Sequence, residues 1–156
     1  MITIEEIPVE HIDDFWEIHF DYLIRNEIIT DEEDKEYFQS EEYREIIKAH
    51  MLRAKDKHHM VYLVEDAKRI GAAQYNIYQS EDGKCFLLDF WVFPEYRGNG
   101  MGHRCFEALE QYTKKDGALY YEINCEKENA HRFWVSNGFQ DAGEDEEGMP
   151  IMVKGK

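Results

Sequence analysis

Three glycines fall within five residues in the segment Tyr96-Arg97-Gly98-Asn99-Gly100-Met101-Gly102-His103. An apolar run precedes this segment and an amphipathic stretch follows it, so it joins a predicted strand to a predicted helix. Glycines allow the backbone to approach a ligand closely, and the free N–H groups at the start of a helix favour an anion. The segment therefore predicts a phosphate-binding loop, with a plain glycine turn as the alternative.

Two familiar nucleotide-binding motifs do not describe this loop. A Walker A loop ends in Gly-Lys-Ser/Thr, which does not occur here. A dinucleotide fingerprint needs a third glycine where this chain has His103, although Glu122, twenty residues after Gly102, mimics the acid that binds a ribose. That fold also needs more than the one strand–helix–strand unit found here. A nucleotide-dependent oxidoreductase is therefore disfavoured as a function.

The apolar run from Cys85 to Phe93 contains one charged residue, Asp89. Burial disfavours the charged form of a carboxyl group and can prepare it to take a proton. Asp89 is therefore a candidate general base, and Glu122 on the neighbouring predicted strand competes with it. The alternative is a structural carboxylate held in a bulge or by a loop.

The elements that must position these residues follow one another without a linker. Hydrophobic periodicity and turn residues predict strands and helices in alternation. The strands span 2–7, 60–64, 70–78, 85–93, 119–125 and 149–154, and the helices span 12–23, 30–53, 100–115 and 129–137. This β-α-α-β-β-β-α-β-α-β order predicts an α/β fold with a mixed sheet flanked by helices, in a single domain over residues 1–156.

Local signals set several of these boundaries. Thr30 followed by Glu33 is typical of a capping box at the start of the second helix. The turn Glu81-Asp82-Gly83-Lys84 joins two strands as a hairpin. Asn129 could act as the N-cap of the last helix, and Gly138 is placed to end it.

The composition excludes several classes of protein. No apolar run reaches the roughly 18 to 20 residues of a membrane span, and the acidic start of the chain lacks the form of a signal peptide. The net charge of −16 argues against a nucleic-acid partner. Three cysteines without metal-ligand spacing are typical of free thiols in a reducing cytoplasm. The histidines show no zinc motif, so no metal is expected.

The negative charge is concentrated in the first part of the chain. Residues 1–66 contain 19 Asp and Glu residues against 7 Lys and Arg residues, a net charge of −12. This excess either aids solubility or takes part in recognition. The second interpretation predicts that the first half of the protein meets a cationic partner.

Two sequence blocks resemble the GNAT superfamily of N-acetyltransferases. The segment 89–102 resembles the family pattern Arg/Gln-x-x-Gly-x-Gly/Ala after a strand that ends in Val-x-Pro, and Arg97, Gly100 and Gly102 fill its positions. The segments 129–134 and 138–139 resemble the later block Asn-Ala-x-x-Phe-aromatic followed by Gly-Phe. The resemblance implies a mostly antiparallel sheet, acetyl-CoA as acyl donor, and transfer to a primary amine of a cationic small molecule or peptide.

The resemblance also implies a role for each residue of the two blocks. The pantetheine arm of coenzyme A would pair with the backbone of Phe90, Trp91 and Val92, on a strand that the family bulges and splays from its neighbour. The N–H group of Val92 would also stabilise the oxyanion of the tetrahedral intermediate. The pyrophosphate would bind Arg97 and the backbone of Gly98, Asn99, Gly100, Met101, Gly102 and His103. Asn129, Phe133 and Trp134 would contact the pantetheine end.

One position departs from the family pattern. Relatives carry a tyrosine four residues before the glycine of the later block, where it protonates the departing thiolate, and this chain has Trp134 there. Tyr112, Tyr120 and Tyr121 are possible substitutes. The departure leaves a non-catalytic acyl-CoA sensor as an alternative function. The resemblance further implies that residues 26–34 border the acceptor site and that a homodimer is possible.

Overall fold

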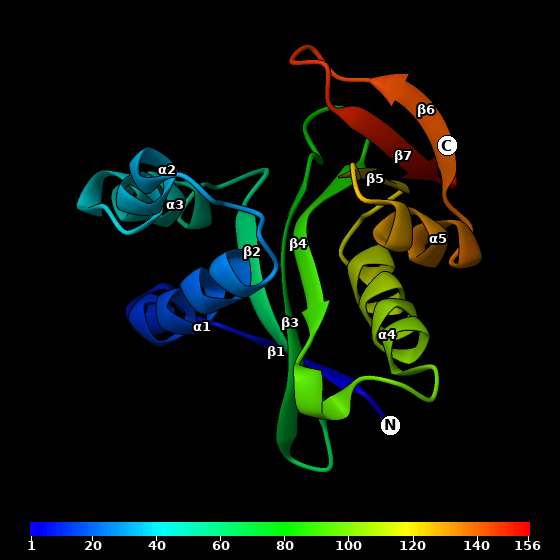
Figure 1. Ribbon diagram of the computed structural model, residues 1–156. Coiled ribbons are helices and arrows are strands. Elements are labelled where there is room, and N and C mark those ends of the chain that lie inside the picture. The colour runs from blue at the N-terminus through cyan, green and yellow to red at the C-terminus, as the bar shows by residue number, and fades with distance from the viewer.

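A seven-stranded sheet in the order β1-β2-β3-β4-β5-β7-β6 forms the centre of the computed structural model, which describes residues 1–156 (Figure 1). Its strands are β1 (Thr3–Glu6), β2 (His58–Glu65), β3 (Lys68–Ile77), β4 (Lys84–Val92), β5 (Tyr120–Asn124), β6 (Gln140–Glu144) and β7 (Pro150–Lys154). β4 and β5 are parallel, and every other neighbouring pair is antiparallel. The predicted mixed, mostly antiparallel sheet is confirmed.

Helices cover both faces of the sheet (Figure 1). On one face lie η1 (Val9–His11), α1 (Ile12–Arg25), α2 (Glu32–Phe38) and α3 (Glu41–Met51), and on the other lie α4 (Met101–Lys115) and α5 (Glu128–Ser136). The short helix η2 (Pro94–Tyr96) joins β4 to the loop before α4. Each face encloses its own apolar cluster, because α1 and α3 on one face and α4 and α5 on the other bury apolar residues against the sheet.

The predicted second helix, residues 30–53, is wrong as a single element. It is divided into α2 and α3, because the Ser40 hydroxyl accepts a hydrogen bond from the N–H of Tyr43 at 3.1 Å and so starts a new helix. The first of the two begins at Asp31, whose Oδ1 accepts from the N–H of Asp34 at 2.7 Å. Asp31, not Thr30, is therefore its N-cap.

Two predictions near the end of the chain also need correction. β6 was not predicted, because all five of its residues are exposed and no apolar alternation marks it. Asn129 is not the N-cap of the last helix, since α5 begins at Glu128 and is preceded by Lys127. The Oδ1 of Asn129 accepts from the N–H of Ala130 within the first turn.

β4 leaves its neighbour halfway along its length. The register against β3 shifts between Gln74 and Tyr75, which makes Leu88 an extra residue in β4. β4 pairs with β5 only over Lys84–Phe86. The two strands diverge beyond that point, and the bulge and splay that the family resemblance implies are present.

Candidate active site

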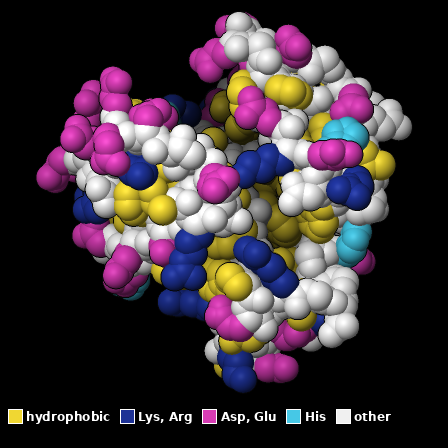
Figure 2. Space-filling model, viewed as in Figure 1, with side chains coloured by type: hydrophobic (Ala, Val, Ile, Leu, Met, Phe, Trp, Pro, Cys, Tyr) yellow, Lys and Arg dark blue, Asp and Glu magenta, His cyan; other side chains and the backbone are white.

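A cleft of about 580 Å³ lies where β4 and β5 diverge. Its walls come from β4, β5, the loop before α5, α5 itself and the loop after α1. The lining residues are Tyr22, Asn26, Glu27, Ile28, Leu87, Leu88, Asp89, Phe90, Ile123, Asn124, Cys125, Glu126, Lys127, Asn129, Ala130, Phe133, Trp134 and Met149. Figure 2 shows the hollow between the two halves of the molecule with hydrophobic side chains on its floor.

Backbone groups of β4 face this cleft in alternation. Phe93 donates its N–H to Ile70 in β3 at 2.8 Å, whereas the carbonyl of Val92 points away from β3 and accepts from Arg97 Nε at 2.9 Å. Successive residues of a strand direct their backbone groups to opposite sides. Phe90 therefore presents its N–H and C=O groups to the cleft, whereas Trp91 directs its own toward β3. Val92 directs its groups to the same side as Phe90, where it lines the adjoining hollow beside the glycine loop.

The glycine loop has the backbone that its composition predicts. Gly98, Asn99 and Gly100 all have positive φ, at 100°, 53° and 72°. An added Cβ at Gly98 or Gly100 would meet no protein atom within 4 Å. At Gly102 it would lie 2.7 Å from the ring of Phe133, so this glycine allows α4 and α5 to pack closely.

The same loop presents backbone donors without protein acceptors. Met101 and Arg104 donate to carbonyls within the loop, at Gly98 and Gly100. The N–H groups of Gly98, Asn99, Gly100, Gly102 and His103 donate to no protein atom. Free N–H groups at the start of a 15-residue helix suit an anion such as a pyrophosphate.

Asp89 lies on the floor of the cleft and is held by two side chains from other elements. His19 Nε2 donates to Asp89 Oδ2 at 2.8 Å, and Gln74 Nε2 donates to the same oxygen at 2.8 Å. The His19 side chain is 5% exposed and that of Asp89 is 13% exposed. The second carboxylate oxygen, Oδ1, accepts no hydrogen bond from the protein and is available to a ligand in the cleft.

A buried polar chain continues behind Asp89. His58 Nε2 donates to Gln74 Oε1 at 2.8 Å, and His58 Nδ1 lies 3.2 Å from Asn76 Oδ1. Burial lowers the pKa of His58, and this effect outweighs the hydrogen bonds with Gln74 and Asn76, which raise it. A neutral imidazole carries one N–H, which the shorter contact assigns to Nε2. His58 thereby fixes which end of Gln74 faces Asp89.

The structure does not bring Glu122, the competing carboxylate, to the cleft. Glu122 forms an ion pair with Lys84, whose Nζ lies 3.4 Å from its Oε2. It is absent from the residues that line the cleft, although its neighbour Ile123 is among them. Asp89 is the one of the two predicted bases that faces the cleft.

None of the three tyrosines considered as substitutes for the missing acid lies in the cleft. Tyr112 donates its hydroxyl to Glu6, Tyr120 donates to Asp82, and Tyr121 donates to the carbonyl of Glu110. The structure therefore does not bring any of these possible substitutes to the cleft. Trp134 is 8% exposed. Its ring packs edge-on against Phe90, Phe106 and Phe139 while it also lines the cleft.

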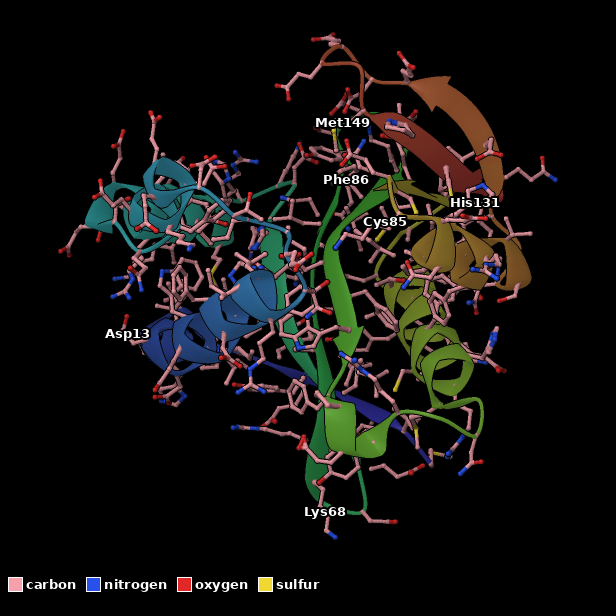
Figure 3. All side chains as sticks on the ribbon, in the orientation of Figure 1. Asp13, Lys68, Cys85, Phe86, His131 and Met149 are labelled. Carbon is pink, nitrogen blue, oxygen red and sulfur yellow. The ribbon has the colours of Figure 1, made fainter.

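A hydrogen bond joins two walls of the cleft that come from opposite faces of the sheet. Lys127, before α5, donates from Nζ to the carbonyl of Asn26 at the end of α1. Asn26, Glu27 and Ile28 line the cleft, so the first part of the connection 26–34 borders it. Residues 30–34 do not. Met149, in the turn between β6 and β7, lies at the same end of the sheet as Phe86 (Figure 3).

Sequence reasoning missed His19 and Tyr22. Both lie on the face of α1 that packs against the core, where helical periodicity predicts burial and gives no sign of a site. One signal was available in the sequence. His19 and Asp89 are ionisable residues, and each lies in an element, α1 or β4, that is otherwise largely apolar on its buried side. Only the packing of α1 against β4 shows that the two groups meet.

The fold and the cleft define an acetyltransferase. Residues 13–139 match the Acetyltransferase (GNAT) family, and the chain belongs to that family. Membership confirms the predicted class of enzyme, which transfers an acetyl group from acetyl-CoA to an amine. No group of His, Cys, Asp and Glu side chains is arranged to hold a metal ion. None of the helices combines the length and the apolar character of a membrane span.

Relatives of known name and structure share this pattern. The chain is 30% identical over 123 residues to the spermine/spermidine N(1)-acetyltransferase of Bacillus subtilis, covering 72% of this chain and 81% of that protein. The PaiA N-acetyltransferase of Thermoplasma acidophilum in complex with coenzyme A has the same fold, with a TM-score of 0.72, 23% identity, and coverage of 100% and 99% of the two chains. The aminoglycoside-bound AAC(6')-Ib, in complex with ribostamycin and coenzyme A, aligns with a TM-score of 0.69, 16% identity, and coverage of 99% and 93%.

Proposed function

We propose that acetyl-CoA binds in the cleft between β4 and β5 and that an amine enters beside α1 to take its acetyl group. The observation that carries this proposal is the divergence of β4 from β5 beyond Phe86, which leaves backbone groups of β4 free for a ligand. Acting as an added strand, a pantetheine arm satisfies such groups as β5 would. Phe90 offers both its N–H and its C=O group for this role, and Val92 offers its N–H group, since its carbonyl accepts from Arg97. Trp91 offers neither group.

The remainder of coenzyme A fits the loop before α4. Its pyrophosphate would accept from the free N–H groups of residues 98–103, and Arg97 stands at the start of that loop. The apolar walls supplied by Phe133 and Trp134 suit the pantetheine chain, and Asn129 also lines the cleft. The residues present therefore fit the donor that the family uses.

The chemistry requires a free amine, because a lysine-like ammonium has a pKa of about 10.4. Asp89 Oδ1, which faces the cleft, takes one proton from the incoming ammonium. The amine nitrogen then attacks the thioester carbonyl, and the N–H of Val92 stabilises the oxyanion. The C–S bond breaks, its electron pair stays on sulfur, and the second proton of the nitrogen passes to that sulfur.

The acceptor that fits best is a cationic polyamine. Three carboxylates, Glu27, Asp89 and Glu126, line the cleft against one lysine, Lys127. Asp and Glu side chains also gather over α2 and α3 and over the turn between β6 and β7 (Figure 2). Such a field attracts cations and falls with ionic strength. The relative from Bacillus subtilis is named a spermine/spermidine N(1)-acetyltransferase, and polyamines of that kind belong to the acceptor class proposed here.

A panel of amines tests this function. Purified protein would be assayed with acetyl-CoA and spermine, spermidine, ribostamycin or a lysine peptide, at low and at physiological salt. We expect spermine or spermidine to be the best acceptor and its kcat/KM to fall as salt rises. An anionic best acceptor, or a rate indifferent to salt, would overturn the acceptor class.

The panel also separates this function from the sensor that the missing tyrosine suggests. A sensor would bind acetyl-CoA in a calorimetric titration and acetylate none of the amines. The hydrogen-bonded carboxylate facing the cleft favours the enzyme, since a sensor has no need of a base.

We further propose that residues 1–156 act as one domain, in the cytoplasm, which the three free, buried thiols suit. Light scattering would test the homodimer.

A further inference from the structure

No side chain of this protein has yet been assigned to deliver a proton to the sulfur of the departing coenzyme A. Trp134 occupies the position of the family tyrosine, and its indole N–H is not acidic enough to replace a phenol. Tyr112, Tyr120 and Tyr121 donate to Glu6, Asp82 and the carbonyl of Glu110, outside the cleft. Any protein group that supplies this proton must lie in the cleft itself.

Tyr22 of α1 is the one tyrosine of the chain that lines the cleft. It also lines a hollow of about 520 Å³ between α1 and η2, and a smaller one of about 290 Å³ beside the glycine loop. Asn26 is the only other residue common to all three hollows. Tyr22 thus stands where the proposed donor cleft meets the space beside α1 from which the amine enters.

The ring of Tyr22 is held while its hydroxyl is left free. The ring stacks on Trp91 of β4, with centroids 4.2 Å apart and planes 11° from parallel. The backbone of Tyr22 is tied by its carbonyl, which accepts from Asn26 Nδ2 at 3.0 Å. Its hydroxyl makes no hydrogen bond with the protein, unlike those of Tyr112, Tyr120 and Tyr121.

We propose that the Tyr22 hydroxyl carries the proton from the attacking nitrogen to the sulfur of coenzyme A. After attack, the nitrogen of the tetrahedral intermediate holds one proton too many. As the C–S bond breaks, that proton passes to the Tyr22 oxygen while the Tyr22 proton passes to the sulfur. The products are the amide and the free thiol, and Tyr22 ends in its starting form. This inference rests on the proposed placement of acetyl-CoA.

The surroundings of Tyr22 suit a relay in which the phenol never bears a full charge. Burial and the negative charge of Asp89 raise the pKa of Tyr22, and Arg97 opposes them only in part. The phenol is therefore protonated throughout the range in which enzymes work. A tyrosinate would be unfavourable beside the negative charge of Asp89. We therefore expect Tyr22 to gain one proton and lose the other at the same time, so that no tyrosinate forms.

The variant Tyr22→Phe tests the relay, because it keeps the ring on Trp91 and removes the hydroxyl. Tyr43→Phe is the matched control: Tyr43 is also a buried phenol of raised pKa without a hydrogen-bond partner, and it lines none of the three hollows. Both variants and the wild-type enzyme would be measured for acetyl-CoA affinity by calorimetry and for kcat with spermine, or with the best amine of the panel.

We expect Tyr22→Phe to lower kcat by about 10²–10⁴-fold, as for loss of a general acid, with wild-type affinity for acetyl-CoA. Tyr43→Phe should keep its kcat. A loss below about tenfold would overturn the relay, as would an equal loss in Tyr43→Phe or an equal loss of acetyl-CoA affinity. A wild-type protein that binds no acetyl-CoA would instead contradict the proposed function.

Discussion

His19 Nε2 lies 2.8 Å from Asp89 Oδ2, although the two residues are 70 positions apart in the chain. The contact joins α1 to β4 directly beside the cleft. It occupies one carboxylate oxygen and, together with Gln74, sets the orientation of the other. Asp89 is therefore presented to the cleft as a positioned carboxylate, a requirement for efficient proton transfer.

Replacing Asp89 by Asn should remove the base and preserve the shape of the site. The amide oxygen of Asn can still accept from His19 and Gln74, so the fold and acetyl-CoA affinity should be retained. We expect kcat to fall by about 10²–10⁴-fold, the usual contribution of a general base. Steady-state kinetics with calorimetry of acetyl-CoA would measure both quantities.

Glu122→Gln is the control for that variant, since Glu122 was the competing candidate and pairs with Lys84 away from the cleft. Its kcat should match the wild type. His19→Gln should lose less activity than Asp89→Asn, because His19 acts through the carboxylate. If Glu122→Gln were impaired as much as Asp89→Asn, the assignment of the base to Asp89 would fail.

The stability of the fold should decrease between neutral and mildly acidic pH because of His58. Burial lowers its pKa in the folded protein, so the unfolded chain binds the proton more readily. Above the pKa of about 6.5 that a histidine has in the unfolded chain, His58 causes no loss of stability. As the pH falls from there toward the lowered pKa of the folded protein, the destabilisation grows. Urea unfolding at pH 7.5, 6.5 and 5.5 would measure this fall.

His58→Gln is the control, because a glutamine at this position has no proton to gain over that range. The variant should show a flatter dependence of its unfolding free energy on pH, whatever its absolute stability. A slope unchanged from the wild type would mean that other groups cause the acid sensitivity.

Gly100→Val should weaken acetyl-CoA binding far more than it weakens the fold. Gly100 has a φ of 72°, and its added side chain would point into space that no protein atom fills within 4 Å. In the proposed complex that space belongs to the pyrophosphate. The left-handed backbone adds about 1–2 kcal/mol of strain. Calorimetric titration with acetyl-CoA would measure the loss.

The strain can be separated from the lost ligand contact with Gly143→Val. Gly143 in β6 also has a positive φ, at 88°, and open space around its Cβ position, and it does not line the cleft. This variant should show a similar loss of stability and bind acetyl-CoA normally. Equal affinities in Gly100→Val and the wild type would contradict the phosphate-loop assignment.

Trp134→Phe should remain active. Trp134 lies in a cluster of aromatic rings and has no hydroxyl to donate, so its contribution is packing. The smaller ring leaves a void that should lower the unfolding free energy by about 1–2 kcal/mol. We expect kcat within about threefold of the wild type. A folded Trp134→Phe protein that binds acetyl-CoA and shows no turnover would contradict this interpretation.

Local patterns in the sequence were enough to predict the conformation of the glycine loop and the packing face of α5. The glycines at 98, 100 and 102 and the block at 129–134 predict a loop, a helix start and a packing face, because backbone conformation and helix periodicity depend on near neighbours. This dependence on near neighbours also explains why the order of most helices and strands was predicted correctly. It also explains two of the three errors in helix starts, where Asp31 and Ser40 compete with neighbours as N-caps.

Only the tertiary structure decided which side chains meet in the cleft. The direction of each strand residue and the packing of α1 on β4 bring His19 and Tyr22 to Asp89 and Trp91, and place Glu122 with Lys84. The cleft itself exists because β4 and β5 pair over three residues and then diverge. These relations join residues far apart in the chain, so no local pattern of residue types encodes them.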